Sequence, residues 1–160
     1  MKILLKNITE NAMKYNGEVV CKSIFNNGDD IKFLENIKFN GTLRKGEDFV
    51  EISGTVTADF ATSCHACGEE AKGKVSFDIF TTYRREPAED EYELEGNEVD
   101  FDKMILENIR LNLPVKILCK EDCKGICPIC RKNLNVEKCD CKTDGKTDSP
   151  FDVLNKLLDK

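Results

Sequence analysis

The sequence contains a single histidine, His65, among 160 residues. It also has no Ser/His/Asp order, no glycine-rich phosphate-binding loop and no carboxylate pair on a recognisable catalytic scaffold. General acid–base chemistry near neutral pH most often uses histidine, so this scarcity argues against an enzyme. The sequence predicts a protein that binds other molecules without transforming them.

A net positive charge is also absent. Thirty acidic side chains outnumber 24 basic ones, which gives a formal net charge of −6. A broad basic surface is therefore excluded, and any contact with nucleic acid must come from a local patch or through a partner protein. With 40% hydrophobic and 34% charged residues, the composition fits one folded domain, or one domain with a small appended module.

Long apolar runs are missing as well. The N-terminal stretch has only residues 3–5 as an apolar run, too short for a signal-peptide core, and no later stretch reaches membrane-spanning length. We therefore expect a cytoplasmic protein. In a reducing compartment nine cysteines are poor candidates for structural disulfides, so their clustering indicates metal. Cys21 lies outside the clusters and is expected to be a small buried hydrophobe.

Three stretches alternate apolar and polar residues with a period of two, which is typical of half-buried strands. They cover residues 37–43, 50–60 and 75–83, and the links between them are short. Short links favour antiparallel neighbours over parallel strands joined by helices. The first part of the chain is therefore expected to form an antiparallel sheet.

Two helices are expected after these strands. The first covers about residues 102–113, with Ile105 and Ile109 on one face, and Pro114 ends it. The second closes the chain, because Ser149 is a good N-cap residue in front of an apolar stripe. Apolar stripes of this kind are usually packing faces, so both helices are expected to cover the sheet.

An acidic stretch separates the strands from the first helix. Residues 86–102 carry nine acidic side chains and no basic one, which predicts a solvated loop, or alternatively a docking strip for a basic partner. The fold class expected is α+β. An antiparallel β-rich region covers residues 1–85, an acidic loop covers 86–100, and 101–160 hold the first helix, a cysteine-rich zinc-binding segment and the C-terminal helix. These parts are expected to pack as one domain.

Eight of the nine cysteines fall into clusters. Six lie in CKEDCKGICPICRKNLNVEKCDC, residues 119–141, and two lie in CHACG, residues 64–68. The last four have the spacing C-x2-C-x8-C-x-C, which lets four thiolates converge on one metal ion. The other four would form a second all-cysteine site that joins the strand turn to the segment after the first helix. The predicted ligands of one or two zinc ions are Cys64, Cys67, Cys119, Cys123, Cys127, Cys130, Cys139 and Cys141.

Spacing alone leaves other arrangements open. The pair Cys119 and Cys123 could combine with Cys139 and Cys141, one site could be empty, and iron–sulfur or free thiols are alternatives to zinc. The histidine inside CHACG is expected to be an exposed turn residue, with ligation in place of a cysteine as the alternative.

Redox and catalytic roles for the cysteines are disfavoured. A thioredoxin-like C-x-x-C needs its first thiolate at a helix N-terminus, yet the residues after CHACG alternate like a strand. An all-cysteine tetrahedron also leaves no open position for water, and its thiolates make the metal a poor Lewis acid. We expect the metal to hold the structure together.

Five features, in this order, resemble the YceD family, the large ribosomal RNA subunit accumulation proteins. They are CHACG after a β-rich half, the acidic gap, VDFDKMILENIRLNLP, CKGICPICRKNLNVEKCDC and the closing SPFDVLNKLL. The resemblance runs from about residue 35 to the end of the sequence. Two positions depart from it: Arg131 stands where a glycine is expected after CPIC, and Phe151 follows Pro150 where many relatives have arginine.

The resemblance implies a bacterial cytoplasmic protein needed for the synthesis, processing or stability of large-subunit 23S rRNA, with no known catalytic activity. Residues 114–147 include eight basic and five acidic residues. The basic residues either balance the charge of the thiolates or form a patch for RNA phosphates. We add the hypothesis that the zinc-stapled module presents basic residues to rRNA, to a pre-50S particle or to a ribosomal protein. They are Lys116, Lys124, Arg131, Lys132 and Lys138.

Two other functions fit the same residues. One is a structural zinc adaptor that binds only a protein partner, and the other is a thiol redox sensor that releases zinc on oxidation. Neither a membrane nor a small-molecule substrate is expected among the partners.

Overall fold

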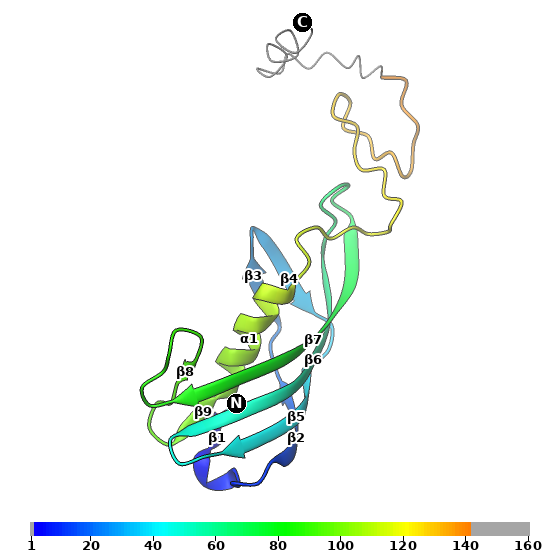
Figure 1. Cartoon of the computed structure of the whole chain (residues 1–160). Helices are drawn as coiled ribbons and strands as arrows, with labels where there is room; N and C mark the ends of the chain where they lie inside the picture. The colour runs from blue at the N-terminus through cyan, green and yellow to red at the C-terminus, as the bar shows by residue number, and fades with distance from the viewer. Residues whose placement is uncertain (1, 142–160) are drawn as a thin grey trace, which may run out of the picture.

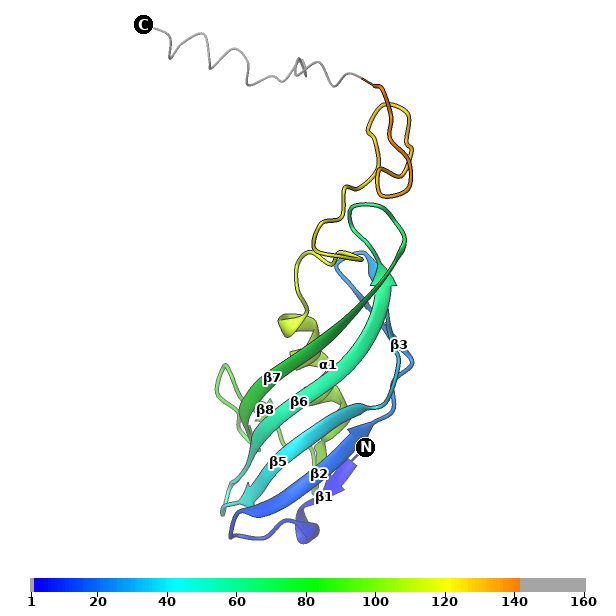
Figure 2. The same ribbon diagram turned by 90° about the vertical axis from the view of Figure 1, so that its right-hand side faces the viewer.

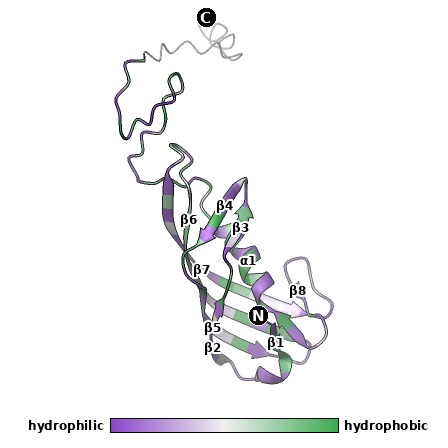
Figure 3. Ribbon diagram, turned by 180° about the vertical axis from the view of Figure 1, so that it is seen from behind, coloured by the Kyte–Doolittle hydropathy of each residue, from purple (hydrophilic) through white to green (hydrophobic). Residues whose placement is uncertain are grey.

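One long antiparallel hairpin organises the protein, as the computed structural model of residues 2–141 shows (Figure 1). β6 (Phe49–Ser63) and β7 (Glu70–Arg84) have fifteen residues each and pair along their full length. Apolar and polar residues alternate along both strands, as the colouring in Figure 3 shows, so one face is buried and the other is polar. The tip of this hairpin extends beyond the rest of the sheet and carries CHACG.

The other strands of the sheet flank this hairpin. β5 (Ile37–Lys45) pairs with the first half of β6, and β2 (Met13–Val19) pairs with β5. β4 (Asp29–Phe33) pairs with β6 nearer the tip, and β3 (Ser23–Asn26) pairs with β4. All these pairings are antiparallel. β8 (Tyr92–Glu93) is the exception, because it pairs in parallel with the end of β7.

A short ribbon and one helix complete the described structure. β1 (Lys2–Leu4), which leads into the 3-10 helix η1 (Leu5–Asn7), pairs with β9 (Glu98–Asp100). α1 (Phe101–Asn112) follows β9 directly, and the Asp100 side chain accepts a hydrogen bond from the Lys103 N–H at 3.1 Å. This cap satisfies one of the free N–H groups at the start of the helix. At twelve residues α1 is too short to span a bilayer, and the described chain offers no other candidate.

α1 lies along the inner face of the sheet, as Figure 2 shows from the side, and its apolar side chains are buried. The Phe101 ring meets the Phe39 ring edge-on, with 5.0 Å between their centroids. The Tyr83 hydroxyl donates to the Asp100 carbonyl at 2.8 Å, which ties β7 to the start of the helix. Full burial of a phenylalanine side chain such as Phe101 contributes about 1.5–3 kcal/mol, so the contact of Phe101 with Phe39 stabilises the helix on the sheet. The buried side chains of α1 are Phe101, Met104, Ile105 and Ile109.

The structure confirms the three predicted strands as β5, β6 and β7, and the first predicted helix as α1. Within residues 2–141 the structure has one α-helix, and the second helix, expected from Ser149 onward, lies outside the described residues. The acidic stretch 86–100 contains β8 and β9. Cys21 is only half-buried, and its sulfur lies 3.3 Å from the Ser23 carbonyl oxygen.

Gly54→Ala is expected to destabilise the sheet. Gly54 faces Gly41 across β5 and β6, and a Cβ on it would lie 2.5 Å from the Asn40 carbonyl oxygen and 2.8 Å from the Phe39 ring. Overpacking of this kind costs about 1–3 kcal/mol. Urea unfolding measures the change, and Ser53→Ala on the exposed face is a control expected to stay within about 0.5 kcal/mol. Equal stabilities of the two variants would contradict this packing.

Candidate metal centres

The turn between β6 and β7 folds tightly around Cys64. The Gly68 N–H donates to the Cys64 carbonyl at 2.9 Å, and the Cys64 N–H donates to the Glu69 carbonyl at 2.7 Å. Gly68 has a φ of +77°, in the left-handed region that glycine adopts without strain. The N–H groups of Ala66 and Cys67 donate to the Cys64 sulfur. The turn therefore prepares this sulfur to carry negative charge.

Cys119 and Cys123, which follow α1 in the chain, lie against this turn. The sulfurs of Cys64 and Cys123 are 3.7 Å apart, and those of Cys67 and Cys119 are 3.5 Å apart. All four sulfurs lie within 4.8 Å of one another, and we call this group site A. Cys64 is buried, and the other three cysteines are half-buried against the hydrophobic core. Site A is thus part of the folded domain.

His65 fixes the hairpin tip to two other parts of the chain. Its ring nitrogen Nδ1 accepts a hydrogen bond from the backbone N–H of Ile117 at 3.2 Å, and the backbone N–H of His65 donates to the Ile117 carbonyl at 2.9 Å. Because Nδ1 accepts, Nε2 carries the proton and donates to the Asp29 carboxylate at 2.9 Å. Within residues 2–141, His65 is not among the potential metal ligands. It joins the hairpin tip to β4 and to Ile117, which lies two residues before Cys119 of site A.

A second group of sulfurs lies in the loop that follows. The sulfurs of Cys127, Cys130, Cys139 and Cys141 all lie within 4.8 Å of one another, and we call this group site B. Cys127 is buried and Cys130 is exposed. Site B is built from one continuous loop, whereas site A joins segments more than fifty residues apart, as the 52-residue separation of Cys67 and Cys119 shows.

Both sites begin with the same backbone turn. In site B the Arg131 N–H donates to the Cys127 carbonyl at 2.8 Å, and the Cys127 N–H donates to the Lys132 carbonyl at 2.8 Å. Arg131 therefore takes the place that Gly68 has in site A, and it has a φ of +58°. The arginine that stands where the resemblance expects a glycine leaves the turn intact, with a dihedral strain of about 1–2 kcal/mol.

Backbone N–H groups stabilise the thiolate of the first cysteine in each C-x-x-C. At Cys64 burial raises the pKa, but N–H donors, that of Ala66 first among them, lower the pKa to about 6. At Cys127 the N–H groups of Cys130 and Ile129 outweigh burial and lower the pKa to about 6. The thiolate is the form that binds a metal, so each turn supplies one prepared ligand.

One thiol in each group, Cys119 in site A and Cys141 in site B, holds its proton because its neighbours are negative. Hydrogen bonding with Cys67 raises the pKa of the Cys119 thiol to about 12, and Cys130 does the same to the Cys141 thiol. Four thiolates this close repel one another unless a cation lies among them. The donor set fits a soft divalent cation in tetrahedral coordination, which would displace these protons and leave no open position for water. Both groups of cysteines could hold a metal ion.

The sulfur of Cys123 has an additional donor that sequence reasoning missed. The Asn135 side-chain amide donates to it at 3.3 Å and is the main cause of a lowered Cys123 pKa. The only signal was the sequence NLN, which stands inside the longest gap between the site B cysteines. The five basic residues proposed for RNA contact are all exposed around the two sites, and Lys132 pairs with Glu137 at 3.0 Å.

Comparison with known proteins gives a family for this arrangement. The family model described as large ribosomal RNA subunit accumulation protein YceD matches residues 52–158, two thirds of the chain, which take in most of β6, all of β7 and α1, and all eight clustered cysteines. The chain belongs to the YceD family. No solved structure matches it.

Relatives of this YceD-family chain share only part of their length with it. The chain is 35% identical over 66 residues to the chloroplastic large ribosomal RNA subunit accumulation protein YCED homolog 1 of Arabidopsis thaliana, covering 41% of the chain and 20% of that protein. It is 27% identical over 89 residues to uncharacterized proteins of Mycobacterium tuberculosis and Mycobacterium bovis, covering 51% of the chain and 43% of each. The matched segment is therefore less than half of each relative.

Removing either pair of turn cysteines is expected to remove one bound metal ion. Protein purified without chelator should carry about two ions by inductively coupled plasma mass spectrometry, and Cys64→Ser/Cys67→Ser or Cys127→Ser/Cys130→Ser should each carry about one. The site A variant should also melt at a lower temperature than the site B variant, because only site A joins distant segments. Metal-free protein with free thiols would contradict the assignment of both sites.

Proposed function

We propose that this protein is a non-enzymatic ribosome-biogenesis factor of the bacterial cytoplasm that supports the synthesis, processing or stability of large-subunit 23S rRNA. The observation that carries the proposal is the YceD match, which spans the central hairpin, the helix and both cysteine groups. In this proposal the two sites hold zinc and act as structural staples. The tip that they build contacts rRNA within a pre-50S particle, or a ribosomal protein bound to it.

Zinc is the metal proposed for both sites. Eight sulfur donors in two groups of four match its preference for tetrahedral thiolate coordination, and N–H donation to sulfur stabilises the ligands. Iron–sulfur clusters use the same donors but absorb visible light, so the spectrum of the purified protein distinguishes the two. A metal held by four thiolates supplies rigidity without catalytic chemistry.

The non-enzymatic assignment is supported by the engagement of the only histidine. Both ring nitrogens of His65 are occupied, one by the Ile117 N–H and the other by the Asp29 carboxylate. A histidine held in this way positions the turn and has no free nitrogen for proton transfer to a substrate.

The surface of the two sites combines positive charge with exposed apolar side chains. Basic side chains can neutralise RNA phosphates, and apolar side chains can pack against bases or against a protein. The five basic residues are exposed and spread over residues 116–138. Four apolar residues in and beside this segment are also exposed, at 92%, 48%, 59% and 79%: Val115, Ile126, Ile129 and Val136.

Arg131 is the strongest candidate for direct contact. Its positive φ is a conformation in which a glycine would be free of strain, and the equivalent residue of site A is Gly68. Strained residues of this kind concentrate at functional sites, where the side chain has a use that offsets the strain. A guanidinium is also the side chain best shaped to bind phosphate with two hydrogen bonds.

A protein-only adaptor is the second candidate. The acidic stretch is held in place by β8, by β9 and by the Arg84 side chain, which donates to the Glu91 carboxylate at 2.8 Å. An ordered acidic surface suits a basic protein partner. This alternative requires binding to large-subunit proteins and none to protein-free rRNA.

Neutralising the basic tip is expected to weaken binding to protein-free 23S rRNA by about tenfold or more. The variant replaces the five proposed contact residues with glutamine, and the matched control replaces five exposed lysines of the sheet region, Lys14, Lys22, Lys32, Lys38 and Lys74. In filter-binding titrations at several salt concentrations, each lost phosphate contact reduces the slope of log affinity against log salt by about one. Equal affinities for tip variant and control would leave the adaptor as the better function.

Arg131→Gly is expected to separate stability from binding. Glycine relieves about 1–2 kcal/mol of left-handed strain but loses more backbone entropy on folding, so the net change lies between zero and about 1 kcal/mol of added stability. Binding to rRNA should weaken in the same variant because the guanidinium is gone. Urea unfolding and filter binding measure the two quantities. Full binding by the glycine variant would show that Arg131 makes no contact.

A further inference from the structure

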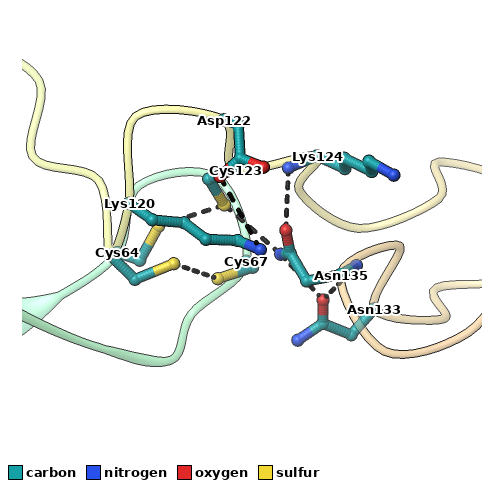
Figure 4. Close-up of polar contacts among 9 residues, drawn as sticks. Cys64, Cys67, Lys120, Asp122, Cys123, Lys124, Asn133 and Asn135 are labelled. Carbon is teal, nitrogen blue, oxygen red and sulfur yellow. Dashed lines mark hydrogen bonds and ion pairs between the residues drawn. The ribbon is translucent and has the colours of Figure 1, made fainter.

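Asn135 belongs to the loop of site B, yet its side chain contacts site A. Its Nδ2 donates to the sulfur of Cys123, a site A ligand, at 3.3 Å, and its Oδ1 accepts from the Lys124 N–H at 2.9 Å (Figure 4). A backbone N–H can only donate, so Oδ1 must face Lys124 and the amide nitrogen must face the sulfur. The direction of the hydrogen bond to the ligand is therefore fixed.

Asn133 fixes the position of this amide. Its Oδ1 accepts from both the backbone N–H and the Nδ2 of Asn135, each at 3.0 Å. Its own Nδ2 lies 3.5 Å from the Glu69 carboxylate, on the hairpin tip that carries the first ligands of site A. The two asparagines thus form one hydrogen-bonded unit between the site B loop and site A.

Backbone contacts dock the same loop on the tip. The Ile126 N–H donates to the Ala66 carbonyl of the tip at 3.1 Å. Within the segment after α1, the Leu134 N–H donates to the Gly125 carbonyl at 2.9 Å. Ile126 and Asn133 also form an isolated antiparallel bridge. A Cβ on Gly125 would lie 3.0 Å from the Ala66 carbonyl oxygen, so the approach is close. The loop that carries site B therefore contacts the hairpin tip that carries site A.

The ligands of site B lie at both ends of the segment that carries Asn135. Residues 131–138 run from Cys130 to Cys139, so a metal ion shared by these cysteines would anchor both ends of this segment in addition to its hydrogen bonds. Hydrogen bonds from outside the ligand set orient metal ligands, and their removal typically lowers metal affinity by about 10–100-fold. A metal ion at site B would therefore restrain the loop that places the Asn135 amide on a site A ligand.

We propose that sites A and B hold their metal ions as a coupled pair, with Asn135 as the positioning residue. Metal at site B holds the Asn135 amide on the sulfur of Cys123, and this hydrogen bond slows metal loss from site A. Coupling of this kind is reciprocal in binding free energy, so metal at site A also raises the affinity of site B for its metal. The inference rests on the metal binding in the proposed function and is independent of RNA contact.

The test follows chelator-driven release of zinc from the loaded full-length protein, with a chromogenic chelator as the readout. Cys64→Ser/Cys67→Ser retains only site B and Cys139→Ser/Cys141→Ser retains only site A, so these variants assign the two release phases. Asn135→Ala should speed release from site A by about 10–100-fold. Val136→Ala, at an exposed neighbouring residue of the same loop, should leave that rate within about twofold.

The decisive comparison is a double-mutant cycle. The site A variant that lacks Cys139 and Cys141 should already release its zinc faster, and adding Asn135→Ala to it should change the rate little, since both changes remove one interaction. Asn135→Asp adds a further control, because a carboxylate can accept from the Lys124 N–H but cannot donate to sulfur. It should release zinc from site A at least as fast as the alanine variant.

Additive effects in the cycle, or an unchanged site A rate in Asn135→Ala, would overturn the coupling. Slow release by the aspartate variant would also overturn it, because the amide would then act only by filling space. Two zinc ions released at independent rates would remove the coupling and leave the proposed function standing. Absence of bound zinc would instead remove the metal part of that function, so the two failures are distinguishable.

Discussion

The pairing of β6 with β7 is the constraint on which the rest of the structure depends. At one end Tyr83 of the hairpin donates to the Asp100 carbonyl at the start of α1, beside the contact of Phe39 of β5 with Phe101 of α1, and at the other end the hairpin presents the first two ligands of site A. α1 runs along the hairpin toward the same end, rising about 18 Å over its twelve residues, so the chain after it reaches the tip within a few residues (Figure 1). The distance between Cys67 and Cys119 is thus set by strand and helix lengths before any metal binds.

The two sites have different physical roles because they close different loops. Site A joins segments that are 52 residues apart in sequence, so a metal there restricts a long stretch of the unfolded chain. Site B closes a short loop that is already ordered by its own hydrogen bonds, so a metal there would restrict only a short stretch of the unfolded chain. In a compartment that reduces disulfides, a thiolate–metal staple is a means of joining such segments. In the proposed coupling, the docked loop with Asn135 makes metal retention at site A depend on metal at site B.

Sequence reasoning found the parts of this structure that are governed by short-range pattern. β5, β6 and β7 alternate cleanly because one face is buried and the other is polar, and α1 shows its stripe for the same reason. Cysteine spacing gave the same two groups of four that the structure brings together. β3 and β4 have four and five residues, too few for a periodic signal, and β8 and β9 lie in an acidic run that resembles a loop. Asn135 contacts a ligand of the other site only in the folded protein, and the spacing of residues in the sequence does not indicate that contact.

The two C-x-x-C turns show where the chain has room to vary. A Cβ at Gly68 would meet no atom within 4 Å, so the dihedral angle alone favours glycine there. The same turn in site B accepts Arg131 at a φ of +58°, which means that only strain, and no clash, opposes a side chain at this position. At site A, the His65 and Asn135 side chains make hydrogen bonds to other parts of the protein, whereas at site B Cys130 and its flanking residues are exposed. A long charged side chain at the second turn therefore changes the outer surface without disturbing either set of sulfurs. The division between an inner site within the fold and an outer site that carries the proposed contact surface follows from this difference.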